Sequence, residues 1–183
     1  MIEDKERWNK RHVEKPMREN VEPIVEKYID FAQNGNALDI ACGVGRNTHY
    51  IADKGFLVDA VDISDYALGE VKNIATIKKI ETDLDKYNLA VNKYDLIVNI
   101  NYLNRRLLPQ MKEALKSNGI LIFETFIVAH GDFTQPANPE YLLRKNELLH
   151  TFIGLDIIYY EERDDVNLRG EKTRVASLVA RKA

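Results

Sequence analysis

The sequence has little of what marks a secreted, fibrous or membrane-spanning protein. Its 183 residues include one cysteine, five prolines and nine glycines, and no apolar run reaches the ~18 residues that would span a bilayer. The single cysteine, Cys42, cannot form an internal disulfide, which favours a reducing compartment. Residues 1–15 are charged throughout, unlike a secretory leader. We therefore expect a cytoplasmic protein without a membrane partner.

An excess of positive charge is also absent. The chain has 26 Lys and Arg against 29 Asp and Glu, a formal net charge of −3. This balance argues against a nucleic-acid surface that depends on bulk positive charge, although a local basic patch stays possible. Hydrophobic residues make up 45% of the chain, and a domain of about 150 residues already buries roughly 68–70% of its unfolded surface. We expect one globular domain.

Residues 37–47 form the most informative stretch, reading Ala-Leu-Asp-Ile-Ala-Cys-Gly-Val-Gly-Arg-Asn. The apolar run followed by Gly43 and Gly45 predicts a buried strand, a glycine turn and then a helix over 47–54. Free amides at the start of that helix favour a carboxylate or phosphate, and Asp39 can order the loop or meet an ammonium or hydroxyl group. Dinucleotide enzymes have a third glycine where this chain has Thr48, which disfavours a nicotinamide oxidoreductase.

A second candidate ligand stands at the end of the next strand. Residues 56–62 predict a strand that ends at Asp62, about 20 residues beyond the glycine turn, where a carboxylate meets ribose hydroxyls in doubly wound folds. The alternative is that Asp62 caps the helix predicted over 65–75, although Ser64 or Asp65 could serve as that cap equally well.

The rest of the chain alternates between predicted strands and helices. Polar side chains gather where the strand 94–100 ends, at Asn99, Asn101 and Tyr102, and such residues face the ligand crevice of a parallel sheet. A polar turn over 161–171 lets the last two strands pair antiparallel. Further strands are predicted at 76–81, 120–126, 155–162 and 173–181. Helices are predicted at 3–12, 21–32 and 107–116. The remaining segments are a short connection at 85–93, a loop at 128–139 and a partly helical segment at 141–152.

The order Asp39, Cys42, Gly43, Gly45 resembles the first motif of class I S-adenosylmethionine (SAM)-dependent methyltransferases, which usually have glycine where this chain has Ala41. Residues 58–64, 94–98 and 119–125 follow in the order of that superfamily, so the resemblance covers roughly 36–182. It implies an α/β, doubly wound, Rossmann-like fold in a single domain. The seven strands are expected in the order 3-2-1-4-5-7-6, with strand 7 antiparallel. Residues 1–35 would be a helical segment of this domain and a possible cap, ahead of the methyltransferase region 36–183.

Shorter matches point to one branch of the superfamily. Residues 45–47, 102–105, 123–126 and 138–148 are similar to a bacterial group labelled tellurite-resistance or TehB-like methyltransferases. That branch is expected to have a histidine near position 104. This chain has Asn104, which weakens any mechanism that uses this side chain as a base.

The resemblance also implies a cofactor site over the carboxyl ends of strands 1, 2 and 4. Its ligand would be SAM, with S-adenosylhomocysteine (SAH) as product and no metal. In this arrangement Asp62 holds the ribose, and Asn99 contacts the ammonium or carboxylate of the methionine part. Ile63 and Leu84 sandwich the adenine, and Asp83, with Asp85 as its competitor, accepts from the adenine amino group. The remaining predicted cofactor residues are Asp39, Ala41, Gly43, Gly45, Asn47 and Arg11.

The acceptor side is less defined. Tyr102, Arg105 and His130 are the candidate catalytic residues, and Arg105 could instead pair with Glu124 or bind an acceptor anion. Trp8, Arg11, His12 and Phe133 are further acceptor-side candidates. The expected activity is methyl transfer to a small molecule, either a thiol, a chalcogen oxyanion or an amine. A methyltransferase acting on protein or RNA and a non-catalytic SAM-binding protein stay as alternatives, and either a monomer or a homodimer is compatible with the sequence.

Overall fold

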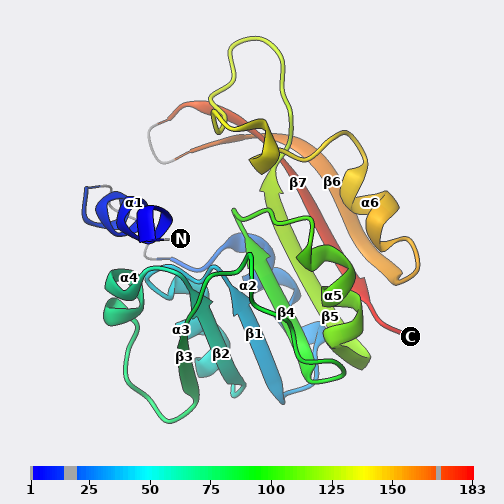
Figure 1. Cartoon of the computed structure of the whole chain (residues 1–183). Helices are drawn as coiled ribbons and strands as arrows, with labels where there is room; N and C mark the ends of the chain where they lie inside the picture. Colours follow the sequence, from blue (N-terminus) through cyan, green and yellow to red (C-terminus); the bar gives the residue numbers. More distant parts are fainter. Residues whose placement is uncertain (1, 15–19, 168–169) are drawn as a thin grey trace.

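The computed structural model describes residues 2–14, 20–167 and 170–183. Seven strands form one sheet in the order β3-β2-β1-β4-β5-β7-β6, in which β7 runs antiparallel to β5 and β6 (Figure 1). This is the predicted fold, and the strand order is confirmed. The strands are β1 (Asn36–Ile40), β2 (Leu57–Asp62), β3 (Ile77–Glu81), β4 (Tyr94–Ile100), β5 (Leu115–Phe126), β6 (Asp156–Val166) and β7 (Lys172–Arg181).

Helices cover both faces of this sheet. On one face, α2 (Pro23–Tyr28), its continuation η1 (Ile29–Phe31) and α3 (Arg46–Asp53) pack in one apolar cluster with alternate residues of β1, β2 and β4. On the other face, α5 (Leu107–Ala114) and α6 (Glu147–Phe152) pack in a second cluster. Because both faces are covered, the central strand β4 is buried along most of its length and reads as a nearly continuous apolar run.

Three element boundaries differ from the sequence prediction. Helix α4 (Asp65–Glu70) ends before residue 75, because Val71 turns extended and buries its side chain. Strand β5 begins at Leu115 instead of residue 120, and its register against β4 shifts between Tyr94 and Leu96. Strand β6 continues to Val166 because it pairs with β7 as far as Lys172, which shortens the predicted polar turn.

The N-terminal helix α1 (Ile2–Glu14) lies beside α4 at the carboxyl edge of the sheet (Figure 1). Lys5 Nζ is 2.9 Å from an Asp65 oxygen and 2.5 Å from one of Glu81. Asn9 Nδ2 donates to Asp65 at 2.7 Å, and its Oδ1 accepts from Ser64 Oγ at 2.6 Å. Residues 1 and 15–19 of the predicted N-terminal segment lie outside the described residues. Within the described ranges, no helix has the length and apolar character needed to cross a membrane.

Candidate functional site

The turn after β1 adopts left-handed backbone conformations at three positions. The φ angles are 53° at Ala41, 54° at Gly43 and 83° at Gly45. A Cβ at Gly45 would lie 2.8 Å from Val71 Cγ2. Gly45 is therefore required by the fold itself, through its backbone angle and its contact with Val71, apart from any ligand. Ala41 adopts a conformation that favours glycine, at the position where the resembling family has glycine.

Asp62, at the end of β2, closes this turn from the neighbouring strand. Its Oδ2 accepts from the Gly43 amide and its Oδ1 from the Ser64 amide, both at 2.8 Å. The cap of α4 is Ser64, whose Oγ accepts from the Ala67 amide at 3.0 Å, so the capping alternative for Asp62 is wrong. Each carboxylate oxygen keeps a second lone pair, which leaves Asp62 able to accept from ribose hydroxyls as well.

Asp39 is buried beneath the turn and held by the residue that replaces the third glycine. Thr48 Oγ1 donates to Asp39 Oδ2 at 2.6 Å. Burial raises the pKa of Asp39 to about 7, although the Thr48 hydroxyl and the Arg46 charge act in the opposite direction. Asp39 and Thr48 thus order the loop through a contact between β1 and α3.

Asn99, at the end of β4, has one satisfied and one unsatisfied side-chain atom. Its Nδ2 donates to the Tyr102 carbonyl at 2.7 Å. Its Oδ1 is buried and accepts no hydrogen bond from any residue that the structure describes. An unpartnered buried acceptor is uncommon in native proteins and indicates a missing donor. The ammonium of an amino-acid ligand is such a donor, so this residue fits the cofactor that the sequence predicts.

Asn47 and Arg46 connect the glycine turn to the start of α2. Asn47 Oδ1 accepts from the Glu22 amide at 2.9 Å, and Arg46 forms an ion pair with the Glu22 carboxylate. All three side chains are largely buried. The structure therefore gives Asn47 a role in joining two helices, and its contact with a cofactor stays a prediction.

The residues predicted to hold adenine follow β2 and β3. Ile63 is half-buried, whereas Leu84 is buried in the apolar cluster beneath α5. Asp83 Oδ1 accepts from the Asp85 amide at 3.0 Å, and Asp85 Oδ1 accepts from Asn104 Nδ2 at 2.8 Å. Each of the two carboxylates thus has one oxygen in use within the protein, and the choice of Asp83 for the adenine amino group stays a prediction.

Of the acceptor-side candidates, Arg105 has the most completely occupied side chain. Its Nε and NH2 donate to the two oxygens of Glu147 at 2.7 and 3.0 Å, and its other bonds reach the carbonyls of Glu140 and Leu142. The suggested Arg105–Glu124 pair is wrong, because Glu124 pairs with Arg163 instead. Arg105 thus fastens η2 (Pro139–Tyr141) and α6 to the end of β4.

Tyr102 and His130 lie in different surroundings. Burial raises the pKa of Tyr102 to about 12, so its hydroxyl stays protonated at neutral pH and accepts a bond from Asn104 at 3.4 Å. His130 is exposed in the loop after β5, and Phe133 is half-buried there. Their parts in catalysis stay predictions.

The aromatic and basic residues of α1 stack on one another. Arg11 Cζ lies 5.0 Å from the Trp8 ring centroid, and the His12 ring centroid is 6.1 Å from that of Trp8. Burial lowers the pKa of His12, and the nearby Asp62 charge opposes this effect. The His12 side of α1 therefore lies near the ribose end of the predicted site, whereas Arg11 is exposed.

Comparison with known proteins agrees with this geometry. The family described as tellurite resistance protein TehB matches residues 1–173. The chain belongs to the TehB family. The resemblance seen in the sequence is confirmed, as are the SAM-dependent methyltransferase family and its cofactor at the level of family and fold.

Three similar proteins illustrate the match. TehB from Haemophilus influenzae superposes with a TM-score of 0.75 and 21% identity, over 98% of this chain and 67% of that one. A SAM-dependent methyltransferase from Methanosarcina mazei superposes with a TM-score of 0.69 and 16% identity, over 89% of this chain and 98% of that one. The uncharacterized protein UNK4.09 of Schizosaccharomyces pombe is 30% identical over 61% of this chain and 46% of its own length. The chain spans less than half the length of these two curated relatives, UNK4.09 and the putative methyltransferase YqeM of Bacillus subtilis.

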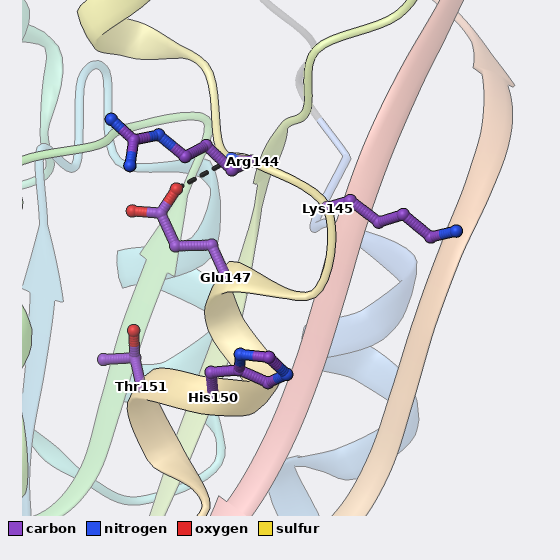
Figure 2. Close-up of a pocket in the computed structure, with 5 residues that line it drawn as sticks. All are labelled: Arg144, Lys145, Glu147, His150 and Thr151. Atoms are coloured by element: carbon purple, nitrogen blue, oxygen red, sulfur yellow. Dashed lines mark hydrogen bonds between the residues drawn. The ribbon is translucent and has the colours of Figure 1, made fainter.

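A surface cavity of about 370 Å³ opens beside the first turn of α6, away from the predicted cofactor residues. Its lining is Arg144, Lys145, Glu147, His150 and Thr151. Figure 2 shows the Glu147 carboxylate directed at the Arg144 backbone, whose amide donates to it at 2.7 Å. None of the predicted cofactor residues lines this cavity, so it is separate from the site at the glycine turn.

Sequence reasoning missed the buried charges on the α2 face. Glu22, Arg46 and the trio Glu124, Arg163 and Ser177 come from five different parts of the chain. The sequence pattern could have pointed to Glu124, which is a polar residue near the end of a predicted strand. It could not have pointed to Arg163, because this residue falls in the predicted polar turn and belongs to a strand only through pairing with β7.

Proposed function

We propose that this TehB-family chain transfers the methyl group of SAM to a small-molecule acceptor. The observation that carries the proposal is the buried, unpartnered Oδ1 of Asn99 beside a turn that Asp62 holds in place. That combination suits a ligand with an ammonium group at one end and ribose hydroxyls further along. When bound, SAM supplies a methyl group already activated by its attachment to a sulfonium.

In this proposal the residues of the chain bind SAM and orient it for methyl transfer. Asn99 would accept from the ammonium, Asp62 from the ribose hydroxyls and Asp83 from the adenine amino group, while Asp39 and Thr48 keep the turn in shape. Orientation and exclusion of water account for several kcal/mol of barrier lowering in such reactions. A soft nucleophile then needs no base, whereas a protonated amine or a hydroxyl needs a proton acceptor within hydrogen-bond reach.

The N-terminal segment is proposed as a cap over this site. Helix α1 lies at the carboxyl edge through Lys5 and Asn9, and Arg7 NH2 reaches the Tyr141 hydroxyl of η2 at 3.5 Å. Two segments far apart in the sequence thus meet at this edge. A covered site suits a small acceptor better than a macromolecule, and the net charge of −3 is consistent with this.

Measuring SAH release tests the proposal. The protein is incubated with SAM and separate panels of thiols, chalcogen oxyanions and small amines, with protein and RNA extracts as the competing substrates. The proposal expects turnover with at least one small molecule. Turnover that requires an extract and is abolished by protease or ribonuclease contradicts it, and favours the macromolecular alternative.

A further inference from the structure

A histidine side chain bonds the segment after α4 to the helix that follows the glycine turn. His49, in α3, is half-buried, and its Nε2 accepts a hydrogen bond from the Lys72 amide at 3.0 Å. The Val71 and Ile74 amides donate locally, to the carbonyls of Leu68 and Lys72. The His49 ring therefore joins this segment to α3 across 23 positions of the sequence.

This contact lies directly against the cofactor turn. Val71 is 1% exposed and packs in the apolar cluster on this face of the sheet. A Cβ at Gly45 would lie 2.8 Å from Val71 Cγ2 and 3.3 Å from His49 Cε1, so both side chains contact the Gly45 backbone. Gly45 is one of the predicted cofactor residues. Separation of residues 71–72 from α3 would therefore remove one of the supports of the glycine turn.

The hydrogen bond requires a neutral imidazole. Because Nε2 accepts from the Lys72 amide, the single ring proton of neutral His49 is on Nδ1. Protonation places a second proton on Nε2 and makes both ring nitrogens donors. The new Nε2–H would then face the Lys72 N–H, so the bond is lost. The attachment of this segment thus depends on the protonation state of one ring.

The groups around the ring favour its neutral form. Burial lowers the pKa of His49, and the charges of Lys72, in the attached segment, and Lys79, in β3, act in the same direction. The Asp53 carboxylate, in the same helix as His49, opposes them. Because the folded-state pKa is lowered, the stabilisation from this contact is complete above the ordinary value of 6.5 and is lost as pH falls through the lowered value.

We propose that neutral His49 is a positioning residue of the cofactor site, which keeps Val71 against Gly45, and that its protonation in mild acid weakens the binding of SAM and SAH. This inference rests on the proposed function and adds regulation of the same site by pH. The cofactor binds the form in which the segment is attached. Cofactor binding and loss of the His49 proton therefore favour each other.

NMR signals of the ring and of the amide test the coupling directly. Without ligand, the His49 Cε1–H and the Lys72 amide should titrate with one shared midpoint below 6.5. Saturation with SAH should lower this midpoint by about 0.5 pH unit or more, which corresponds to about a threefold change in SAH affinity. A Lys72 amide that does not respond, or a midpoint that is the same with and without SAH, overturns the proposal.

Two substitutions separate the acceptor atom from the bulk of the ring. His49→Gln keeps an acceptor oxygen that does not titrate, so SAH affinity should stay within about twofold of wild type at neutral pH and should lose the fall between about pH 7 and about pH 5. His49→Leu fills space without an acceptor and should weaken SAH binding about threefold or more at neutral pH. His150→Gln, at an exposed position that lines the separate cavity beside α6, is the matched control and should keep the wild-type pH profile.

Calorimetric titrations with SAH across this pH range distinguish the outcomes. A pH profile that His49→Gln leaves unchanged assigns the fall in affinity to another group and overturns the proposal, as does wild-type affinity in His49→Leu at neutral pH. If circular dichroism shows that His49→Leu does not fold, the profile of His49→Gln still decides. Wild-type protein that binds no SAH at any pH contradicts the proposed function, whereas SAH binding without a fall that depends on His49 contradicts the role of His49 alone.

Discussion

Ala41 occupies a backbone conformation that suits glycine, and this gives a test of the turn at the scale of one residue. With φ at 53°, alanine pays a steric cost of roughly 1–2 kcal/mol, which exceeds the extra unfolded-state entropy of glycine. We predict that Ala41→Gly raises the free energy of unfolding by up to about 1 kcal/mol, measured by urea denaturation. Ala60→Gly, in β2, is the matched control and should lower it by a similar amount. A destabilising Ala41→Gly contradicts this account.

Asp39 gives a second test, through pH. Because burial raises its folded-state pKa from an ordinary 3.8 to about 7, the folded protein binds a proton that the unfolded chain has lost. Stability from this group is therefore highest at low pH and falls as pH rises from about 4 to about 7, by at most about 1.4 kcal/mol per unit. Asp39→Asn should flatten this slope in urea denaturation series. Wild-type and variant slopes that coincide would show that Asp39 ionises normally.

Single residues also show where sequence reasoning stops. Asp39, Asp62 and Asn99 could be picked out because each stands at the end of an apolar run, where the carboxyl ends of parallel strands meet. The partners that decide their roles, such as Thr48 for Asp39, come from separate elements. Asn47 lies in the first turn of α3, directly after the glycine turn, and its side-chain oxygen accepts a hydrogen bond from the Glu22 amide. No local pattern predicts that contact.

At the scale of elements, the segment from η2 to α6 depends on one ion pair. Arg105 and Glu147 are 42 residues apart and form a two-bond contact, and Glu147 also accepts from the Arg144 amide. We predict that Arg105→Lys, which cannot reproduce the paired geometry, increases hydrogen exchange at the amides of Val128 and Leu143, which link this segment to its neighbours. Lys145→Ala, at an exposed position in the same segment, should leave it unchanged. Equal protection in Arg105→Lys and wild type contradicts the anchoring role.

Element types could be predicted from periodicity, but their ends could not. The strand 94–100 was predicted with its observed bounds because both its faces are covered and most of its residues are apolar. Strand β6 is longer than predicted because its polar outer residues pair with β7. Strand β5 begins earlier than predicted because Leu115 pairs with Tyr94 of β4. Patterning along the sequence shows neither pairing. Helix α4 is shorter because burial of Val71 overrides its helical pattern.

At the scale of the whole molecule, the fold and the cofactor class could be predicted from the order of motifs along the chain. The acceptor could not, because its candidate residues are positioned by contacts between separate segments, such as that of Arg105 with Glu147 and with the carbonyl of Glu140. Of the three candidate catalytic residues, Arg105 has its side chain bound within the protein, whereas Tyr102 and His130 stay candidates.

Calorimetric titration with SAM, SAH and NAD tests the central claim most directly. We predict that SAM and SAH bind and NAD does not, and that Asp62→Ala weakens SAH binding at least tenfold, about 1.4 kcal/mol. Asp53→Ala, at the exposed last residue of α3, is the control and should keep wild-type affinity for SAH. Absence of binding by both sulfur ligands would contradict the account as a whole, and unchanged SAH affinity in Asp62→Ala would remove Asp62 from the site.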